Sequence, residues 1–348
     1  MQLRITKIFS ETSDTKTFFL EPVDTNMFIH YKAGQFLTLL LQHAGRSVRR
    51  SYSLGSAPVI DQQLFITVKR KTNGEISRHL LDHFKEGDIL NSLLPSGRFT
   101  IDEPVAATYC FIAGGSGITP VFALMKELLH YHPATKIILL NQCRNEEQII
   151  YKQALHELHK QFKERFQLIQ LFSQPLSHKE SLQRLNNILL ETIIKQTVNI
   201  HPATTNIQFY LCGPQAMMRM AEFTLKLIGF TNEQIRKEQF VIEAPPPAPL
   251  LTDTSPKEVI IHFQKHTYKL SVAYPQNILN AALQKNIQLP YSCKAGRCST
   301  CAAFCIQGKI VMSMNEVLTE KDIAKGMVLT CVGYAETNVE LDFDSIKI

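Results

Sequence analysis

The chain of 348 residues is long enough for two or three domains. Hydrophobic residues make up 45% and charged residues 20%, as in ordinary globular proteins. The net charge of +6 comes without a basic block, which disfavours a nucleic-acid partner, and no apolar run reaches the roughly 18 residues of a membrane span. Because the first residues lack the apolar core of a signal peptide, we expect a cytoplasmic protein.

The first segment, residues 1–103, is predicted to be an antiparallel β-barrel with one capping helix. Gly, Pro and Asp turns divide it into strand-like runs at 16–20, 35–41 and 64–69. A helix is expected over 76–84, and Pro95–Phe99 is interpreted as a turn into the last strand of the barrel.

A candidate flavin motif, Arg50-Ser51-Tyr52-Ser53, follows a strand-like run in this segment. A guanidinium can pair with a phosphate through two hydrogen bonds, a tyrosine can stack on a flavin ring, and a serine hydroxyl can reach a ring nitrogen. Taken alone, the motif also fits a plain strand with an exposed arginine.

A second element supports a flavin site. The run Val68-Lys69 ends a strand, the chain turns at Gly74, and a helix opens at Ser77. The free N–H groups of such a helix start suit a pyrophosphate.

The second segment, residues 104–243, alternates strands with helices. Strands are expected at 108–113, 136–140, 166–172 and 207–211, and helices at 120–131, 146–162, 181–195 and 215–227. This order predicts a doubly wound parallel α/β sheet, which binds nucleotides at the carboxyl ends of its strands.

Two loops follow strands of this predicted sheet. The first, Gly114-Gly115-Ser116-Gly117-Ile118-Thr119-Pro120, leads into a helix, and its glycines let a diphosphate approach the backbone. A tight structural turn is the alternative. The second, Cys212-Gly213-Pro214, places a thiol either in the core or beside a nicotinamide.

The last segment follows a proline-rich linker, residues 244–256. Residues 257–348 are predicted to form an α+β, β-grasp-like domain in which a helix packs on a small mixed sheet. Strands are expected at 258–263, 267–272 and 302–306, and a helix at 278–285.

Four cysteines of the last segment, Cys293, Cys298, Cys301 and Cys331, have the spacing Cys-x4-Cys-x2-Cys-x29-Cys. Plant-type [2Fe–2S] clusters are held by thiolates at this spacing. Three thiolates in one loop and a distant fourth favour a cluster over a zinc knot or free core cysteines. Three further cysteines lie in strand-like stretches and are expected in the core: Cys110, Cys143 and Cys305.

In this order, the flavin motif, the glycine loop and the Cys-Gly-Pro loop resemble those of the ferredoxin–NADP⁺ reductase superfamily. The carboxyl-terminal segment resembles plant-type ferredoxins, and the resemblance covers essentially the whole chain. The combination resembles the reductase components of multicomponent oxygenases, with the phenylacetyl-CoA epoxidase type favoured.

The resemblance implies that FAD binds the first domain, with Tyr52 on the flavin ring and Ser53 near its N5 atom. The remaining implied FAD contacts are Arg50, Ser51, Val68, Lys69, Gly74 and Ser77. Residues 114–120 and 212–214 would hold the nicotinamide dinucleotide, with Thr119 near the flavin edge and Cys212 orienting the nicotinamide.

Two further expectations concern the nucleotide and the flavin. Arg144, followed by Lys152, lies near the end of the second predicted sheet strand and favours the 2′-phosphate of NADPH over NADH, unless both cations are simply solvated. Plant ferredoxin reductases end in a tyrosine that covers the flavin, whereas this chain continues through Phe240.

These implications combine into a relay. A hydride passes from NAD(P)H to FAD, and single electrons leave through the cluster to an external redox protein. As alternatives to an oxygenase, that protein would be an acyl desaturase, a steroid hydroxylase or a hybrid-cluster protein. A redox-sensing protein is the alternative from a different class.

Overall fold

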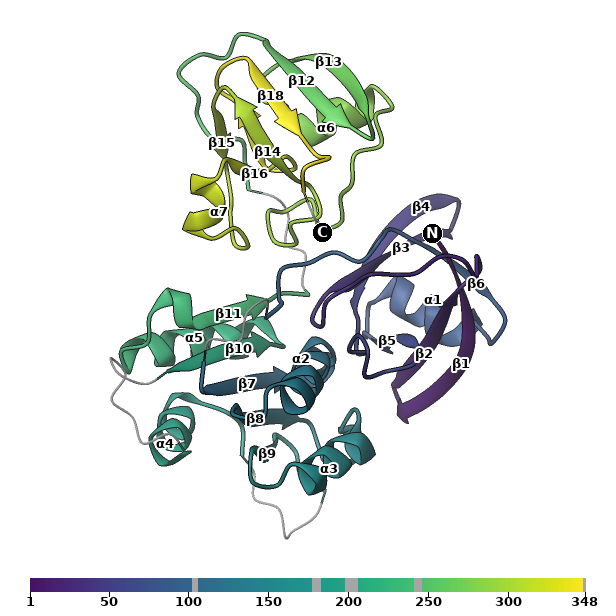
Figure 1. Ribbon diagram of the computed structural model, residues 1–348, viewed down its shortest axis with the longest axis vertical. Coiled ribbons are helices and arrows are strands. Elements are labelled where there is room, and N and C mark those ends of the chain that lie inside the picture. The colour runs from purple at the N-terminus through teal and green to yellow at the C-terminus, as the bar shows by residue number, and fades with distance from the viewer. Residues whose placement is uncertain (102–105, 177–182, 198–205, 241–245, 347–348) are drawn as a thin grey trace. The chain divides into compact units, whose positions relative to one another are not determined.

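The computed structural model describes residues 1–101, 106–176, 183–197, 206–240 and 246–346 (Figure 1). The chain forms two compact units, one made of Met1–Pro95 and Phe99–Phe240 and the other of Ser96–Arg98 and Val241–Ile348. Within the described ranges, no helix is both long enough and apolar enough to cross a bilayer.

The amino-terminal sheet is antiparallel and has the strand order β4-β3-β6-β1-β2-β5. A bridge between Leu54 and Ile66 joins its two outer strands and closes the barrel. Leucines of β3 fill the interior, and α1 buries Ile76 and Leu80 against it. The elements are β1 (Gln2–Thr12), β2 (Thr15–Pro22), β3 (Phe36–His43), β4 (Arg46–Ser53), β5 (Leu64–Lys69), α1 (Glu75–His83) and β6 (Ile89–Ser92).

The expected last barrel strand after Pro95 is wrong, because the barrel sheet ends with β6. Ser96–Arg98 belongs to the second compact unit. Phe99 leaves the barrel and packs on Tyr210 of the α/β sheet, with the ring centres 5.1 Å apart.

The α/β sheet is parallel throughout, in the order β11-β10-β7-β8-β9 (Figure 1). Successive residues of β7 alternate between two cores, one shared with α2 and α3 and the other with α4 and α5. The chain order reverses at β7, so the crevice between β7 and β10 is the expected nucleotide site. The elements are β7 (Thr108–Gly114), α2 (Ile118–Tyr131), β8 (Lys136–Cys143), α3 (Lys152–Gln161), β9 (Phe166–Phe172), α4 (Asn187–Thr197), β10 (Ile207–Cys212), α5 (Gln215–Leu227) and β11 (Ile235–Glu238), with short 3-10 turns at Gly115–Gly117, Glu146–Gln148 and Asn232–Gln234.

Two helices begin later than the sequence indicates. The helix expected from residue 146 begins at Lys152, because Tyr151 has a left-handed backbone with φ of 59°. The helix expected from residue 181 begins at Asn187, after Asn186 accepts a hydrogen bond from the backbone of Leu189 at 2.9 Å. Residues 181 and 182 of that expected helix lie outside the described residues.

The second unit has a mixed sheet in the order β13-β12-β18-β14-β16, on which α6 packs through Ile278 and Leu279. Cys110 and Cys143 are buried in the α/β sheet as expected, but Cys305 is only half-buried, because the end of β14 faces outward. The elements are β12 (Lys257–Phe263), β13 (His266–Val272), α6 (Ile278–Gln284), β14 (Ala302–Gln307), β15 (Ile310–Met312), α7 (Glu320–Ala324), β16 (Met327–Leu329), β17 (Gly333–Ala335) and β18 (Val339–Asp342).

Candidate functional site

The predicted flavin motif occupies the end of β4, paired with β3. The Arg50 side chain is exposed, and its guanidinium donates to the carbonyl of Arg49 at 2.8 Å. Tyr52 lies opposite Leu37, and burial raises the pKa of its phenol far above the ordinary value. Ser53 is buried at the end of the strand. The strand therefore carries an exposed cation, an aromatic ring and a buried hydroxyl in succession.

The turn from β5 into α1 is built around Gly74. A side chain at Gly74 would approach the Ser77 hydroxyl to 2.5 Å. That hydroxyl accepts from the backbone of Lys71 and donates to the carbonyl of Gly74, both at 3.1 Å. The helix starts at Glu75, and its N-cap Gly74 makes no side-chain cap hydrogen bond, which is compatible with an anion site at this end.

Lys69, at the end of β5, has its ammonium 3.2 Å from the amide oxygen of Gln148 and 3.5 Å from the carboxylate of Asp14. Val68, the preceding residue, is fully buried in the barrel. Lys69 is thus placed at the edge of the barrel that carries the Gly74 turn, while Val68 supports the barrel core.

The two loops at the carboxyl ends of β7 and β10 pack backbone against backbone. A side chain at Gly117 would meet the carbonyl oxygen of Cys212 at 2.1 Å, and one at Gly114 would meet the ring of Pro214 at 2.7 Å. A side chain at Gly213 would lie 2.9 Å from the backbone nitrogen of Gly114. The glycines are required by this contact, which brings the two predicted nucleotide loops together. Thr119 and Pro120 are buried in the first turn of α2.

A serine, a carboxylate and a thiol meet between the barrel and the α/β sheet. Cys212 and Glu238 are register partners at the ends of β10 and β11. The Ser53 hydroxyl donates to the Glu238 carboxylate at 3.0 Å, although the two residues are 185 positions apart. Burial and the nearby carboxylate raise the pKa of the Cys212 thiol well above its ordinary value, so the thiol is neutral.

Arg144 follows β8 and is exposed. Its guanidinium donates to the side-chain oxygen of Gln174 at 2.7 Å, and its carbonyl accepts from the backbone of Gln174 at the same distance. Lys152 is exposed on α3, with its ammonium 3.4 Å from the carbonyl of Glu146. Arg144 is thus the cation held at the carboxyl end of the second sheet strand.

The four cysteine side chains of the second unit converge. The Cys293 thiol is within hydrogen-bonding reach of the thiols of Cys298 and Cys331, and the Cys331 thiol is within reach of that of Cys301. Ala302, which follows Cys301, pairs with Leu329 near Cys331, and this register brings the loop to the distant cysteine.

The backbone of the cysteine loop points N–H groups at sulfur. The N–H of Ala295 donates to the sulfur of Cys293, and that of Cys293 to the sulfur of Cys298, each at 3.4 Å. The loop closes through Gly296, whose φ is 71° and where a side chain would meet the carbonyl of Met314 at 2.9 Å. The pairwise thiol contacts and the N–H donors are features that the thiolate ligands of a [2Fe–2S] cluster require.

Three family models match successive parts of the chain. They are an oxidoreductase FAD-binding domain over residues 2–101, an oxidoreductase NAD-binding domain over 111–222 and a 2Fe-2S iron-sulfur cluster binding domain over 261–336. The chain is 30% identical to a subunit of the 1,2-phenylacetyl-CoA epoxidase of Escherichia coli (strain K12), across 99% of this chain and 97% of that protein. The chain belongs to this family of flavin and iron–sulfur reductases.

The reductase is also 29% identical to the ferredoxin reductase component of 3-ketosteroid-9-alpha-monooxygenase from Mycobacterium tuberculosis (strain ATCC 25618 / H37Rv), across 99% of this chain and 96% of that one. Its fold matches phthalate dioxygenase reductase with a TM-score of 0.60 at 21% identity, across 99% and 98% of the two chains. The predicted FAD barrel, parallel NAD(P) sheet and carboxyl-terminal ferredoxin domain are confirmed.

The reductase is an NAD(P)H oxidoreductase with FAD and a [2Fe–2S] cluster as cofactors. Its own residues fit these groups. The uncapped start of α1 and the open space at Gly115, where a side chain would meet no atom within 4 Å, would leave room for phosphates, and the thiols of the four cysteines would supply the cluster ligands.

Two residues of the reductase were not indicated by the sequence patterns. Glu238 ends the short strand β11, which carries no strong pattern, and only the packing of the barrel brings it to Ser53. Arg297, inside the cysteine loop, is 8% exposed and lies 3.2 Å from the Glu316 carboxylate. Its position in the loop between Cys293 and Cys298 was the sequence feature that could have indicated it.

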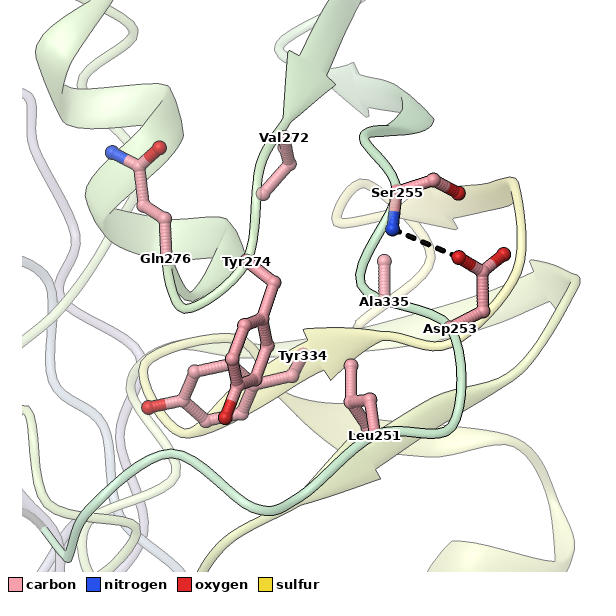
Figure 2. Close-up of a pocket in the computed structure, with 8 residues that line it drawn as sticks. All are labelled: Leu251, Asp253, Ser255, Val272, Tyr274, Gln276, Tyr334 and Ala335. Carbon is pink, nitrogen blue, oxygen red and sulfur yellow. Dashed lines mark hydrogen bonds between the residues drawn. The ribbon is translucent and has the colours of Figure 1, made fainter.

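The second unit also contains a small cavity, lined by residues other than the four cysteines. Figure 2 shows Tyr274 and Tyr334 beside Leu251, with the backbone of Ser255 donating to Asp253 at 2.8 Å. Its volume of about 10 Å³ holds about one water molecule, and none of the predicted cofactor residues lines it. The end of the proline-rich segment therefore packs on the ferredoxin sheet and forms no ligand site of useful size.

Proposed function

We propose that this reductase draws electrons from NADPH and delivers them singly to a partner oxygenase, of the phenylacetyl-CoA epoxidase type. The observation that carries the proposal is the presence in one chain of the Ser53–Glu238–Cys212 group and the four converging thiols. The similarity to the epoxidase component over nearly its full length supports the choice of partner.

The residues would divide the binding work between them. Tyr52 would stack on the flavin ring, and Arg50 would pair with its phosphate region. Lys69 and the turn of Gly74 and Ser77 would hold the diphosphate. When bound, the cofactors supply hydride transfer and single-electron transfer.

The Ser53–Glu238 pair would control a proton at the flavin N5 atom. The Ser53 hydroxyl already donates to the carboxylate, so it is oriented and has an acceptor for its proton. Cys212, neutral and fully buried, would orient the nicotinamide by packing and exclude water from its face. Thr119 would lie at the edge of the flavin.

Domain boundaries at residues 103, 243 and 256 would separate the FAD barrel, the nucleotide sheet, the linker and the ferredoxin domain. The proposal of NADPH over NADH depends on Arg144, which is exposed at the carboxyl end of β8, where a 2′-phosphate is expected.

The relay is tested by removing one cluster ligand. In Cys298→Ser, NADPH-dependent reduction of cytochrome c should fall to background, because that acceptor takes electrons from the cluster, while ferricyanide reduction should continue at the flavin. If Cys298→Ser retains both activities, the cluster is not the outlet and the proposed relay fails.

The partner is tested by reconstitution. The reductase is mixed with the oxygenase component of a phenylacetyl-CoA epoxidase or with that of a 3-ketosteroid hydroxylase, at equal concentration. The proposal expects NADPH-driven product formation with the epoxidase and much less with the hydroxylase. Equal support of both, or support of the hydroxylase alone, would contradict the choice of partner but leave the relay intact.

A further inference from the structure

A buried lysine lies where the barrel packs against the α/β sheet. Lys126, in the middle of α2, is only 5% exposed, although lysines are seldom buried without a partner. Its ammonium lies 4.5 Å from the ring centre of Phe122 on the same helix and 5.0 Å from that of Phe65 on β5. It also forms an ion pair with Asp61. Lys126 therefore connects a helix of the nucleotide sheet to two residues of the barrel.

Asp61 is itself fixed to the chain that follows the flavin motif. Its carboxylate accepts from the backbone N–H of Ala57 at 2.6 Å, and its own N–H donates to the carbonyl of Ala57 at 3.1 Å. This segment begins directly after Ser53, and α2 begins directly after the Gly114–Gly117 loop. The ion pair therefore ties the flavin strand to the nucleotide loop.

A second polar connection crosses the same interface. The hydroxyl of Tyr151 lies 2.5 Å from the hydroxyl of Thr67 on β5, and its backbone N–H donates to the Glu11 carboxylate at 3.1 Å. The Tyr151 ring stacks on Phe122 with the ring centres 4.4 Å apart. A side chain at Gly55 would approach the Tyr151 hydroxyl to 2.6 Å, so the fit is tight.

We propose that the Lys126–Asp61 pair positions the barrel relative to the nucleotide sheet, and so sets the approach of nicotinamide to flavin that hydride transfer requires. Lys126 is a positioning residue, because its ammonium contacts Asp61 and two aromatic rings and belongs to neither predicted nucleotide loop. The proposal relies on the NAD(P)H oxidoreductase activity and not on the identity of the electron acceptor.

The chemistry of the Lys126–Asp61 ion pair explains why it would fix the orientation of the barrel on the α/β sheet and not only stabilise the fold. Apolar contacts such as those of Phe65 and Phe122 are non-directional, so they hold the two surfaces together without specifying one orientation. Displacing the buried ammonium from its carboxylate would leave the Lys126 charge uncompensated, so the ion pair favours one arrangement of the two surfaces. Burial lowers the pKa of Lys126 and Asp61 opposes that shift, which is the balance expected of such a pair.

The test uses Lys126→Met, which keeps the length and apolar stem of the side chain, and Lys160→Met, at an exposed position of α3, as the matched control. The full FAD-loaded chain is mixed with NADPH in a stopped-flow spectrometer. Lys126→Met should reduce the limiting rate of flavin reduction by about tenfold or more, because small misplacements of reacting atoms have large effects on rate. The charge-transfer absorbance between nicotinamide and flavin should weaken, while nucleotide affinity stays at the wild-type value.

Asp61→Asn and the double variant Lys126→Met/Asp61→Asn separate positioning from stability. The double variant leaves no unpaired charge, so its thermal midpoint should recover toward wild type while its rate stays low. The proposal is overturned if flavin is reduced at the wild-type rate in a destabilised single variant or in the double variant. It is also overturned if the variants lose nucleotide affinity while the limiting rate of flavin reduction is unchanged. If Lys126→Met does not fold, the double variant decides by the same criteria.

Discussion

The contact between the two nucleotide loops makes a strong prediction about Gly117. Its backbone is helical, with φ of −64° and ψ of −13°, so alanine would ordinarily be tolerated there. A glycine-to-alanine change at a compatible helical position stabilises a protein by about 0.4–1 kcal/mol. At Gly117 the added carbon would instead lie 2.1 Å from the carbonyl oxygen of Cys212 and 2.7 Å from the nitrogen of Gly213, both backbone atoms.

Because backbone atoms cannot rotate away, the two loops must separate by about 1 Å to bring the 2.1 Å contact to an ordinary distance. Overpacking of this kind costs about 1–3 kcal/mol. A shift of about 1 Å at a reacting pair of groups lowers rates by about 100-fold. Gly117→Ala should therefore lose about 1–3 kcal/mol in denaturant unfolding and about 100-fold in the rate of flavin reduction by NADPH.

Gly115→Ala is the matched control for stability. A side chain at Gly115 meets no atom within 4 Å, but its φ of 55° is left-handed. Alanine there costs about 1–2 kcal/mol through the backbone alone. The clash at position 117 should shift the Cys212 loop in Gly117→Ala but not in Gly115→Ala. The shift would be detected as faster chemical labelling of the Cys212 thiol. Increased stability in Gly117→Ala, the ordinary result for a helical glycine, would refute the close contact of the two loops.

Three further predictions concern single side chains. The Cys212 thiol, whose pKa burial raises, should resist iodoacetamide at pH 8 until the protein unfolds, and mass spectrometry that finds it alkylated in the native state would contradict its burial. Arg144→Ala should raise the KM for NADPH and leave that for NADH unchanged, and equal effects on both would remove Arg144 from 2′-phosphate recognition. Arg297→Gln should lower the reduction potential of the cluster measured by EPR-monitored titration, because a buried cation stabilises the reduced state, whereas Lys321→Gln on the exposed face of α7 should not.

Motifs confined to a few consecutive residues were readable from the sequence. The cysteine loop is one example, because three ligands within nine residues must lie together, whatever the rest of the fold does. The alternation of strands and helices gave the parallel sheet for a similar reason, since each strand–helix pair is a local unit. Helix starts were less predictable, because the left-handed Tyr151 depends on contacts with the barrel and not on its neighbours in the chain.

Residues whose position depends on packing between distant segments were missed. Glu238 follows a short strand of mixed composition and reaches Ser53 only after the barrel and the sheet have packed together. Lys126 lies on a helix that is mostly apolar, and nothing in its local sequence indicates that Asp61 and Phe65 will contact it. In both cases the partner is supplied by the other half of the same compact unit.

The division of the chain into two compact units matches the different demands of the two transfers. Hydride transfer needs reacting atoms about 3–3.5 Å apart, so the barrel and the nucleotide sheet have reason to share one core. They do share one, since Ala57 and Phe65 of the barrel pack in the same cluster as Phe122 and Tyr151. Two polar connections across that core, at Lys126 and at Tyr151, then restrict sliding. The thiols sit in a unit with a separate core, and fusion in one chain still gives them a high effective concentration near the flavin. A shared core for the two nucleotide-binding domains and a separate core for the thiol-bearing unit therefore agree with the chemistry that each must carry out.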